Sequence, residues 1–253
     1  MEIVGVVAPD HLGGDVGLAA ARAVRLVCEG ADLVDIDTIA GEALLDERGL
    51  ARLVRRLLAE GVPVGVTTTS VDAVVSAVDA GARVVCDPSG GSLDPFMLRI
   101  VAAAGVRYVM GQSVARAPAA RPATPAGFRD RAARRVGALL DAGLDPDQVV
   151  LDSGVGHYLR DDSRWDVLEH LELLARAGYP VLVDASWPAL FAASRPEEDD
   201  GWAEEQDAAA VGVCVVAASA NAWGVRVDDV ARAAAVLRGP AGWSRHGTGT
   251  HAR

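Results

Sequence analysis

Residues 62–87 read V-P-V-G-V-T-T-T-S-V-D-A-V-V-S-A-V-D-A-G-A-R-V-V-C-D, and this stretch decides the fold class. A short apolar run at 62–67 is followed by an amphipathic segment that starts near Val71, by Gly81, and by a second apolar run at 82–86. Valine-rich runs are typical of strands buried on both faces of a parallel sheet. The segment between them matches a crossover helix, so the stretch predicts a strand–helix–strand unit.

The same pattern recurs along the whole chain. Strands are predicted at 2–8, 31–37, 62–67, 82–86, 106–111, 147–152, 180–184 and 222–227. The helices that follow them are predicted to start near Val16, Glu42, Val71, Leu93, Phe128, Arg164, Pro188 and Asp228. Eight such units in 253 residues predict a single (β/α)8 TIM barrel over residues 1–238, with 239–253 as a disordered tail. An open doubly wound sheet is the alternative, but no G-x-G-x-x-G follows the first strand.

Glycines support the boundaries of these units. Six of them stand shortly before a predicted strand, where the preceding helix needs a residue that tolerates a left-handed backbone: Gly30, Gly61, Gly81, Gly105, Gly143 and Gly178.

Composition excludes several classes of function. The net charge of −11 argues against a nucleic-acid surface or an anionic membrane as partner. The chain contains no lysine, which excludes Schiff-base chemistry and a P-loop. Its three cysteines, Cys28, Cys86 and Cys214, are too widely spaced for a zinc ribbon or a redox motif, which favours the cytoplasm. The apolar stretch 208–218 is too short to span a bilayer, but it is apolar on every face, which predicts a homodimer through the last helices.

Polar residues follow most of the predicted strands, at the end of a TIM barrel where active sites form. They are Asp10, Asp35, Asp37, Thr67, Asp87, Gln112, Asp152, Asp184, Arg226 and Asp228. The ordinary interpretation is that these side chains cap the following helices. That interpretation fits Asp37, Asp87 and Asp184 less well, because they stand a few residues too early.

Several of these residues belong to short motifs that follow one another along the chain. They are Pro9-Asp10, E-G-A-D-L-V-D at 29–35, D-P-S-G at 87–90, L-D-S-G-V-G at 151–156 and R-V-D-D-V at 226–230. This ordered series, from about Ile3 to Leu237, resembles the dihydropteroate synthases. The resemblance implies a homodimeric TIM barrel of folate biosynthesis, a transferase that joins a pterin methyl diphosphate to p-aminobenzoate and releases diphosphate with the help of Mg²⁺.

The departures from the family's motifs fall on positions that hold substrate or metal. Val6 replaces the first-strand asparagine, Thr67 an aspartate that reads the pterin, and Cys86 a second asparagine. Pro188 replaces a lysine, and Asp228 a histidine. The resemblance leaves a substrate-binding set of Thr67, Asp87, Asp152, Ser186 and Arg226. No catalytic residue is identified, and whether the chain is an enzyme stays open.

The substitutions also make this end of the barrel acidic, which suits a cation better than a diphosphate. A divalent metal such as Mg²⁺ held by Asp10, Asp184 and Asp228 is one candidate, and an amine or guanidinium is another. We therefore expect a barrel that has lost the condensation and acts on a different small molecule. A noncatalytic homodimer with a binding or regulatory role, or a residual synthase, are the alternatives. Cys86 is expected to fill the core rather than to act as a nucleophile.

Overall fold

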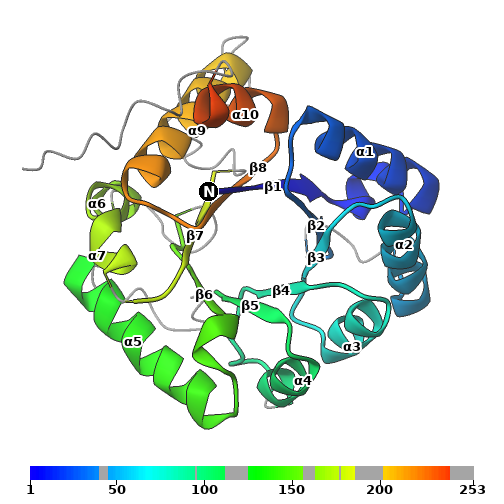
Figure 1. Ribbon diagram of the computed structural model, residues 1–253, viewed down its shortest axis with the longest axis horizontal. Helices are drawn as coiled ribbons and strands as arrows, with labels where there is room; N and C mark the ends of the chain where they lie inside the picture. Colours follow the sequence, from blue (N-terminus) through cyan, green and yellow to red (C-terminus); the bar gives the residue numbers. More distant parts are fainter. Residues whose placement is uncertain are drawn as a thin grey trace, which may run out of the picture.

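In the computed structural model the strands close into an eight-stranded parallel barrel in chain order, β1 to β8, as the sequence predicts (Figure 1). The structure describes residues 1–39, 45–94, 96–111, 125–155, 163–176, 178–185 and 202–239. The strands are β1 (Glu2–Val7), β2 (Leu33–Asp37), β3 (Val64–Thr67), β4 (Val84–Asp87), β5 (Arg107–Met110), β6 (Val149–Asp152), β7 (Val181–Asp184) and β8 (Gly224–Val227). Because β1 pairs with β8, the open doubly wound sheet is excluded.

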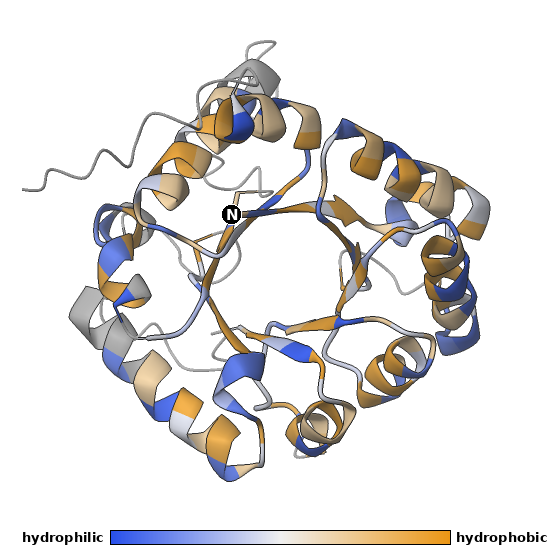
Figure 2. Ribbon diagram, in the orientation of Figure 1, coloured by the Kyte–Doolittle hydropathy of each residue, from blue (hydrophilic) through white to orange (hydrophobic). Residues whose placement is uncertain are grey.

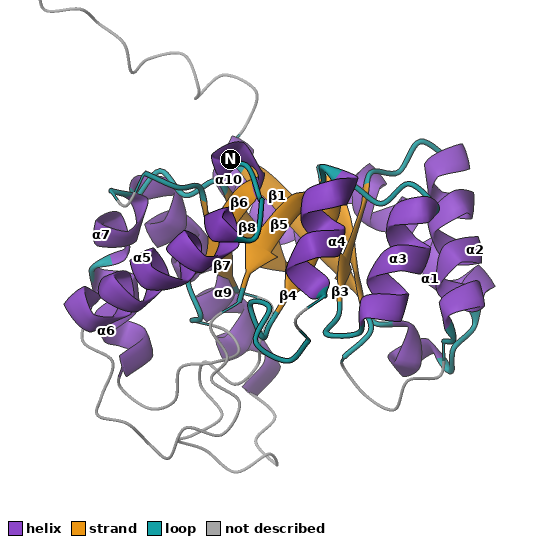
Figure 3. Ribbon diagram, turned by 90° about the horizontal axis from the view of Figure 1, so that it is seen from below, coloured by secondary structure: helices purple, strands orange, loops and turns teal. Residues whose placement is uncertain are grey.

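Helices surround the barrel and cover its outer face (Figures 1 and 3). They are α1 (Val16–Glu29), α2 (Glu47–Ala59), α3 (Val71–Asp79), α4 (Met97–Ala104), α5 (Pro125–Asp141), α6 (Ser163–Glu169), α7 (Leu171–Ala175), α9 (Trp202–Ser219) and α10 (Val230–Arg238), with short 3-10 turns η1 (Pro9–Leu12) and η2 (Pro146–Gln148). Helix α2 starts later than the predicted Glu42 because the Asp46 side chain caps it by accepting from the Gly49 amide at 2.7 Å. The start predicted near Pro188 lies outside the described residues.

Apolar side chains fill two regions that the barrel wall separates. The larger lies between strands and helices, where alternate strand residues meet the apolar helix faces (Figure 2). The smaller lies inside the barrel and consists of Val4, Leu33, Val84, Cys86, Val109, Val150 and Leu182, with Trp223 packed against it. We call these seven residues the interior plug. The predicted role of Cys86 as a core residue is confirmed.

The six glycines before strands all have a positive φ, as predicted. Gly30 shows why this matters, because its φ of 113° ends α1 and turns the chain toward β2. A Cβ there would also lie only 3.1 Å from the Cβ of Ala234 on α10.

Helix α9 contains the apolar stretch 208–218, and its two sides differ. Val213, Cys214 and Ala217 are buried against the barrel, whereas Val215 and Val216 are exposed. The homodimer through this helix stays a prediction, as does the tail, which lies outside the described residues apart from Gly239. Within the described part of the chain, no helix is long and apolar enough to cross a membrane.

Candidate functional site at the carboxyl end of the barrel

Four charged side chains meet inside the barrel at the carboxyl ends of β2, β7 and β8. The guanidinium of Arg226 lies 2.9 Å from Asp35 (Nε to Oδ2), 2.7 Å from Asp37 (Nη2 to Oδ2) and 3.3 Å from Asp184 (Nη1 to Oδ2). Strand register explains the meeting, since Asp184 pairs with Arg226 across β7 and β8, and Asp35 and Asp37 are two residues apart on β2. We call these four residues the Arg226 cluster.

Every member of the Arg226 cluster is buried. The exposed fraction is 0% for Asp35, 5% for Asp37, 1% for Asp184 and 5% for Arg226. Burial and the neighbouring carboxylates of Asp37 and Asp184 raise the pKa of Asp35, against the lowering effects of Arg226 and of a hydrogen bond from Thr67. Burial alone would lower the pKa of Arg226, but the three carboxylates together hold it well above its ordinary value. The four side chains therefore form a buried ion-pair network in which the Arg226 guanidinium stays charged.

Two further residues adjoin the cluster from β3 and β4. The hydroxyl of Thr67 donates to Oδ2 of Asp35 at 2.6 Å, while Oδ1 of Asp35 has no hydrogen-bond partner among the described residues. Burial and the negative charge of Asp35 raise the pKa of the Cys86 thiol well above its ordinary value. Both its burial and its raised thiol pKa disfavour Cys86 as a nucleophile at neutral pH.

Asp87 at the end of β4 organises the loop that follows it. Its Oδ1 accepts from the amide of Ser89 at 2.8 Å, and its Oδ2 accepts from the amide of Gly91 at 2.7 Å and from the Tyr108 hydroxyl at 2.7 Å. The side chain of Arg135 donates to the backbone carbonyls of Ser89 and Gly90. This fully buried carboxylate is thus committed to holding the turn 87–91 against β5 and α5.

The carboxylates nearest to solvent at this end are those of Asp10, Asp152 and Asp228. Asp152 is partly buried and accepts from the amide of Gly154 at 2.7 Å, and Asp10 lies in the turn η1. Asp228 is exposed, yet partial desolvation and the nearby Asp184 raise its pKa to about 6, against the lowering effects of Arg226, Arg22 and His11. Water around its exposed carboxylate weakens these electrostatic effects.

Residues 10–228 match the family model for "Pterin binding enzyme". A dihydropteroate synthase of Mycobacterium leprae is 33% identical over 246 residues, covering 90% of this chain and 86% of that protein. The chain belongs to the pterin-binding enzyme family.

Solved structures of this family share the barrel. The dihydropteroate synthase from Xanthomonas albilineans in complex with 7,8-dihydropteroate aligns with a TM-score of 0.80 and 28% identity, over 94% of this chain and 91% of that one. A dihydropteroate synthase from Anaplasma phagocytophilum, with bound 6-hydroxymethylpterin-monophosphate, has the same fold at a TM-score of 0.79 and 20% identity, over 94% of this chain and 97% of that one.

The structure brings together only some of the residues that were predicted to bind substrate. Thr67 and Arg226 meet around Asp35, whereas Asp87 is occupied by its own turn. Asp152 lies at the end of β6, and Ser186 lies outside the described residues. Substrate contact by any of these residues stays a prediction.

The predicted metal ligands of this pterin-binding family member do not form a ready metal centre. Asp184 faces the guanidinium of Arg226, Asp228 is exposed, and Asp10 lies in a separate turn. Within the described ranges, no three His, Cys, Asp or Glu side chains are grouped so as to hold a metal ion. As placed, these donors do not form a preset Mg²⁺ site, and metal binding by Asp10, Asp184 and Asp228 stays a prediction.

The ordinary interpretation of the aspartates as helix caps is wrong for the helices whose caps are described. Side chains that cap α1, α2, α3 and α10 belong to Asp15, Asp46, Ser70 and Asp229. The strand-end aspartates stand apart from these caps, and the sequence did not show that three of them would surround Arg226. The available signal was parity, since Asp35 and Asp37 on one strand must face the same side as each other.

Proposed function

We propose that the carboxyl end of this barrel binds a small organic cation, an amine or a guanidinium, and that the chain no longer joins a pterin diphosphate to p-aminobenzoate. One observation carries the proposal. Arg226, which matches the arginine of the family's diphosphate site, is buried and already ion-paired with three aspartates. The guanidinium is thereby withdrawn from any incoming anion.

The energetics argue against binding of a diphosphate at this place. To reach Arg226, the anion has to displace carboxylates from a buried ion-pair network, and breaking a buried pair costs about 3–5 kcal/mol. The family positions replaced at Val6, Thr67, Cys86, Pro188 and Asp228 each remove a polar or charged contact worth about 1.5–3 kcal/mol. Together these losses exceed the roughly 8 kcal/mol that a micromolar ligand gains on binding.

The charges at the carboxyl end of the barrel favour a cation. With all groups ionised, three carboxylates around one guanidinium leave the Arg226 cluster with an excess of negative charge. Asp152 and Asp228 add carboxylates closer to solvent, and Asp228 reaches toward Asp184 closely enough to be perturbed by it. A positively charged ligand at this place relieves the repulsion among these groups, whereas a diphosphate adds to it.

A noncatalytic role for the same site is the second candidate. It is favoured by the raised pKa of Cys86 and by the commitment of Asp87 to its turn, which leave neither residue ready for chemistry. Both candidates require ligand binding at the carboxyl end. They differ in whether the bound molecule is changed, which mass analysis of the ligand after incubation decides.

Calorimetry with matched probes tests the proposal. We expect agmatine, which carries both an amine and a guanidinium, to bind, and inorganic pyrophosphate not to bind. Asp228→Asn and Asp152→Asn should each weaken agmatine, whereas Asp79→Asn, on the outer helix α3, should not. Tight binding of pyrophosphate, or agmatine affinity that is unchanged in both site variants, contradicts the proposal.

The loss of condensation has its own test. A strain that lacks its dihydropteroate synthase should fail to grow without folate end products when it expresses this chain. The synthase from Mycobacterium leprae, which is 33% identical, serves as the positive control. Robust growth supported by this chain identifies a residual synthase and overturns this part of the proposal.

A further inference from the structure

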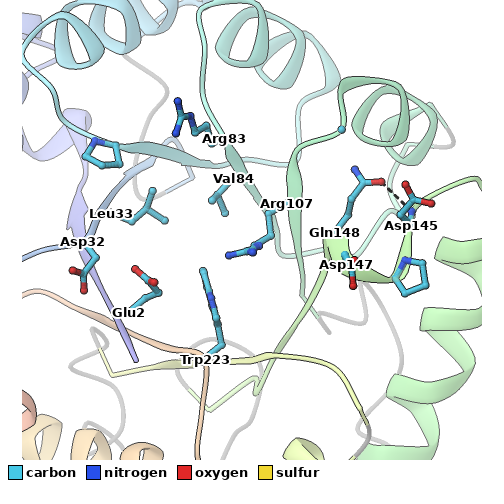
Figure 4. Close-up of a pocket in the computed structure, with 13 residues that line it drawn as sticks. Glu2, Asp32, Leu33, Arg83, Val84, Arg107, Asp145, Asp147, Gln148 and Trp223 are labelled. Carbon is cyan, nitrogen blue, oxygen red and sulfur yellow. Dashed lines mark hydrogen bonds between the residues drawn. The ribbon is translucent and has the colours of Figure 1, made fainter. Parts of the chain in front are cut away.

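A cavity opens at the other end of the barrel, where the strands begin. It has a volume of about 720 Å³ and is lined by 13 residues, including Glu2, Leu33, Val84, Arg107 and Trp223 (Figure 4). Small-molecule pockets are typically about 300–1,000 Å³ in size. The interior plug separates this amino-end cavity from the Arg226 cluster, because Leu33 and Val84 belong to both the plug and the cavity wall.

Two opposite charges face this cavity without neutralising each other. Figure 4 shows Glu2 and Arg107 on either side of the Trp223 ring, and the Arg107 guanidinium lies 5.2 Å from the centre of that ring. Among the described residues, neither Glu2 nor Arg107 has an ion-pair partner within 4.0 Å. A cation–π contact orients the arginine but leaves its full charge in place.

The other charged residues of the cavity are placed differently. Asp32 is already bound through Oδ2, to the Arg238 guanidinium at 2.6 Å and to the amide of Ile3 at 2.8 Å. Arg83 lies across β4 from Trp223, and Asp145 and Asp147 lie on the far side near η2 (Figure 4). The centre of the cavity therefore presents one carboxylate, one guanidinium and an apolar floor.

We propose that the amino-end cavity binds a zwitterionic small molecule with an apolar body, of the α-amino acid class. Its carboxylate would pair with Arg107, its ammonium group with Glu2, and its side chain would pack on Trp223, Leu33 and Val84. A simple anion would leave Glu2 without a partner, and a simple amine would leave Arg107 without one. Since the two charges lie on opposite sides of one ring, a single ligand that carries both charges satisfies both.

The test uses three probes of similar shape, measured by calorimetry on the full chain. L-phenylalanine carries both charges, 3-phenylpropionate lacks the ammonium group, and 2-phenylethylamine lacks the carboxylate. We expect L-phenylalanine to bind about tenfold more tightly than either of the others, the effect of one charge-assisted contact at a partly exposed site. Methyl NMR signals of Leu33 and Val84 should shift on binding, while those of Val6 at the carboxyl end should not.

Two variants make the test specific to the residues. Arg107→Gln should weaken L-phenylalanine about tenfold and leave 2-phenylethylamine unchanged, and Glu2→Gln should weaken L-phenylalanine and leave 3-phenylpropionate unchanged. Arg99→Gln, on the exposed face of α4, is the matched control and should change nothing. No binding of L-phenylalanine, equal affinity for all three probes, or equal effects of the three variants overturns the proposal. Shifts at Val6 would instead assign the ligand to the carboxyl end.

Discussion

The two ends of this barrel handle charge in opposite ways. At the carboxyl end, Arg226 is 5% exposed and touches three carboxylates that are themselves buried. At the amino end, Arg107 is exposed and faces an indole ring, with Glu2 on the ring's other side. Both arginines point inward from a strand, so strand parity does not distinguish them. What differs is whether carboxylates come close enough to pair.

This difference decides which of the two arginines stays accessible to a ligand. A buried ion pair gains little net stability, but it becomes indispensable once it is built, because either partner alone is a desolvated charge. An exposed arginine on an aromatic ring contributes little to stability and keeps its charge available to a ligand. The Arg226 guanidinium is therefore held by carboxylates of the protein, whereas the Arg107 guanidinium stays accessible to a ligand.

The largest expected effect comes from applying one substitution to both ends. Arg226→Met leaves three buried carboxylates without a counter-charge, and we expect the free energy of unfolding to fall by about 3–5 kcal/mol. Arg107→Met removes only a cation–π contact at an exposed position, and the expected loss is below about 1 kcal/mol. Urea denaturation of both variants measures the contrast. Equal losses would show that the two ends do not differ as the structure implies.

An intermediate effect is expected from Asp87, which tests whether the carboxyl end depends on buried carboxylates beyond the Arg226 cluster. Asp87→Asn replaces one of the two carboxylate oxygens by an NH2 group, which cannot accept the hydrogen bonds that the amides of Ser89 and Gly91 and the Tyr108 hydroxyl donate there. We expect a loss of about 2 kcal/mol, measured by urea denaturation. Tyr108→Phe removes one of these three bonds and should cost less. An Asp87→Asn variant with an unchanged free energy of unfolding would mean that the turn does not depend on Asp87, which would again be a candidate for substrate binding.

Much of the fold could be predicted from the sequence, for a physical reason. Strands buried on both faces need apolar runs, and helix ends need glycine. The strand predicted at 82–86 and the helix end at Gly105 could therefore be predicted without any long-range information. The starts of α2 and α4 were harder to predict. Asp46 caps α2, and the amide of Phe96 donates to Asp94 just before α4, and such local side-chain bonds shift a helix start by several residues.

The site was predictable as a set of residues but not as an arrangement. Parallel strands bring their ends together, so Asp35, Asp184 and Arg226 were expected at one end of the barrel. Whether they would line an open site or close on one another depends on strand stagger and on rotamers, which no local pattern encodes. The amino-end cavity was not predicted, because active sites of this fold form at the carboxyl ends of the strands. A charged residue at the first position of a strand, as at Glu2 and Arg107, was the signal available.

The smallest expected effect concerns Asp228, the exposed member of the carboxyl end, and it links that end to pH. Its pKa of about 6 in the folded chain lies above its ordinary value of 3.8, so the folded state holds this proton more tightly than the unfolded chain does. The stability that Asp228 contributes is therefore fully present below about pH 4 and is lost as the pH rises through about 6. Asp228→Asn should remove this loss.

We expect Asp228→Asn to match the parent chain near pH 4 and to exceed it by about 1 kcal/mol or less at pH 7, since water screens an exposed carboxylate. Urea denaturation of both proteins between pH 4 and 7 measures the difference. High salt should shrink the part of it that comes from Asp184 and leave the part that comes from desolvation. Parallel stability curves for the two proteins would mean that Asp228 is as fully hydrated as an ordinary surface aspartate. The carboxyl and amino ends of the barrel would then differ in their electrostatics only at Arg226.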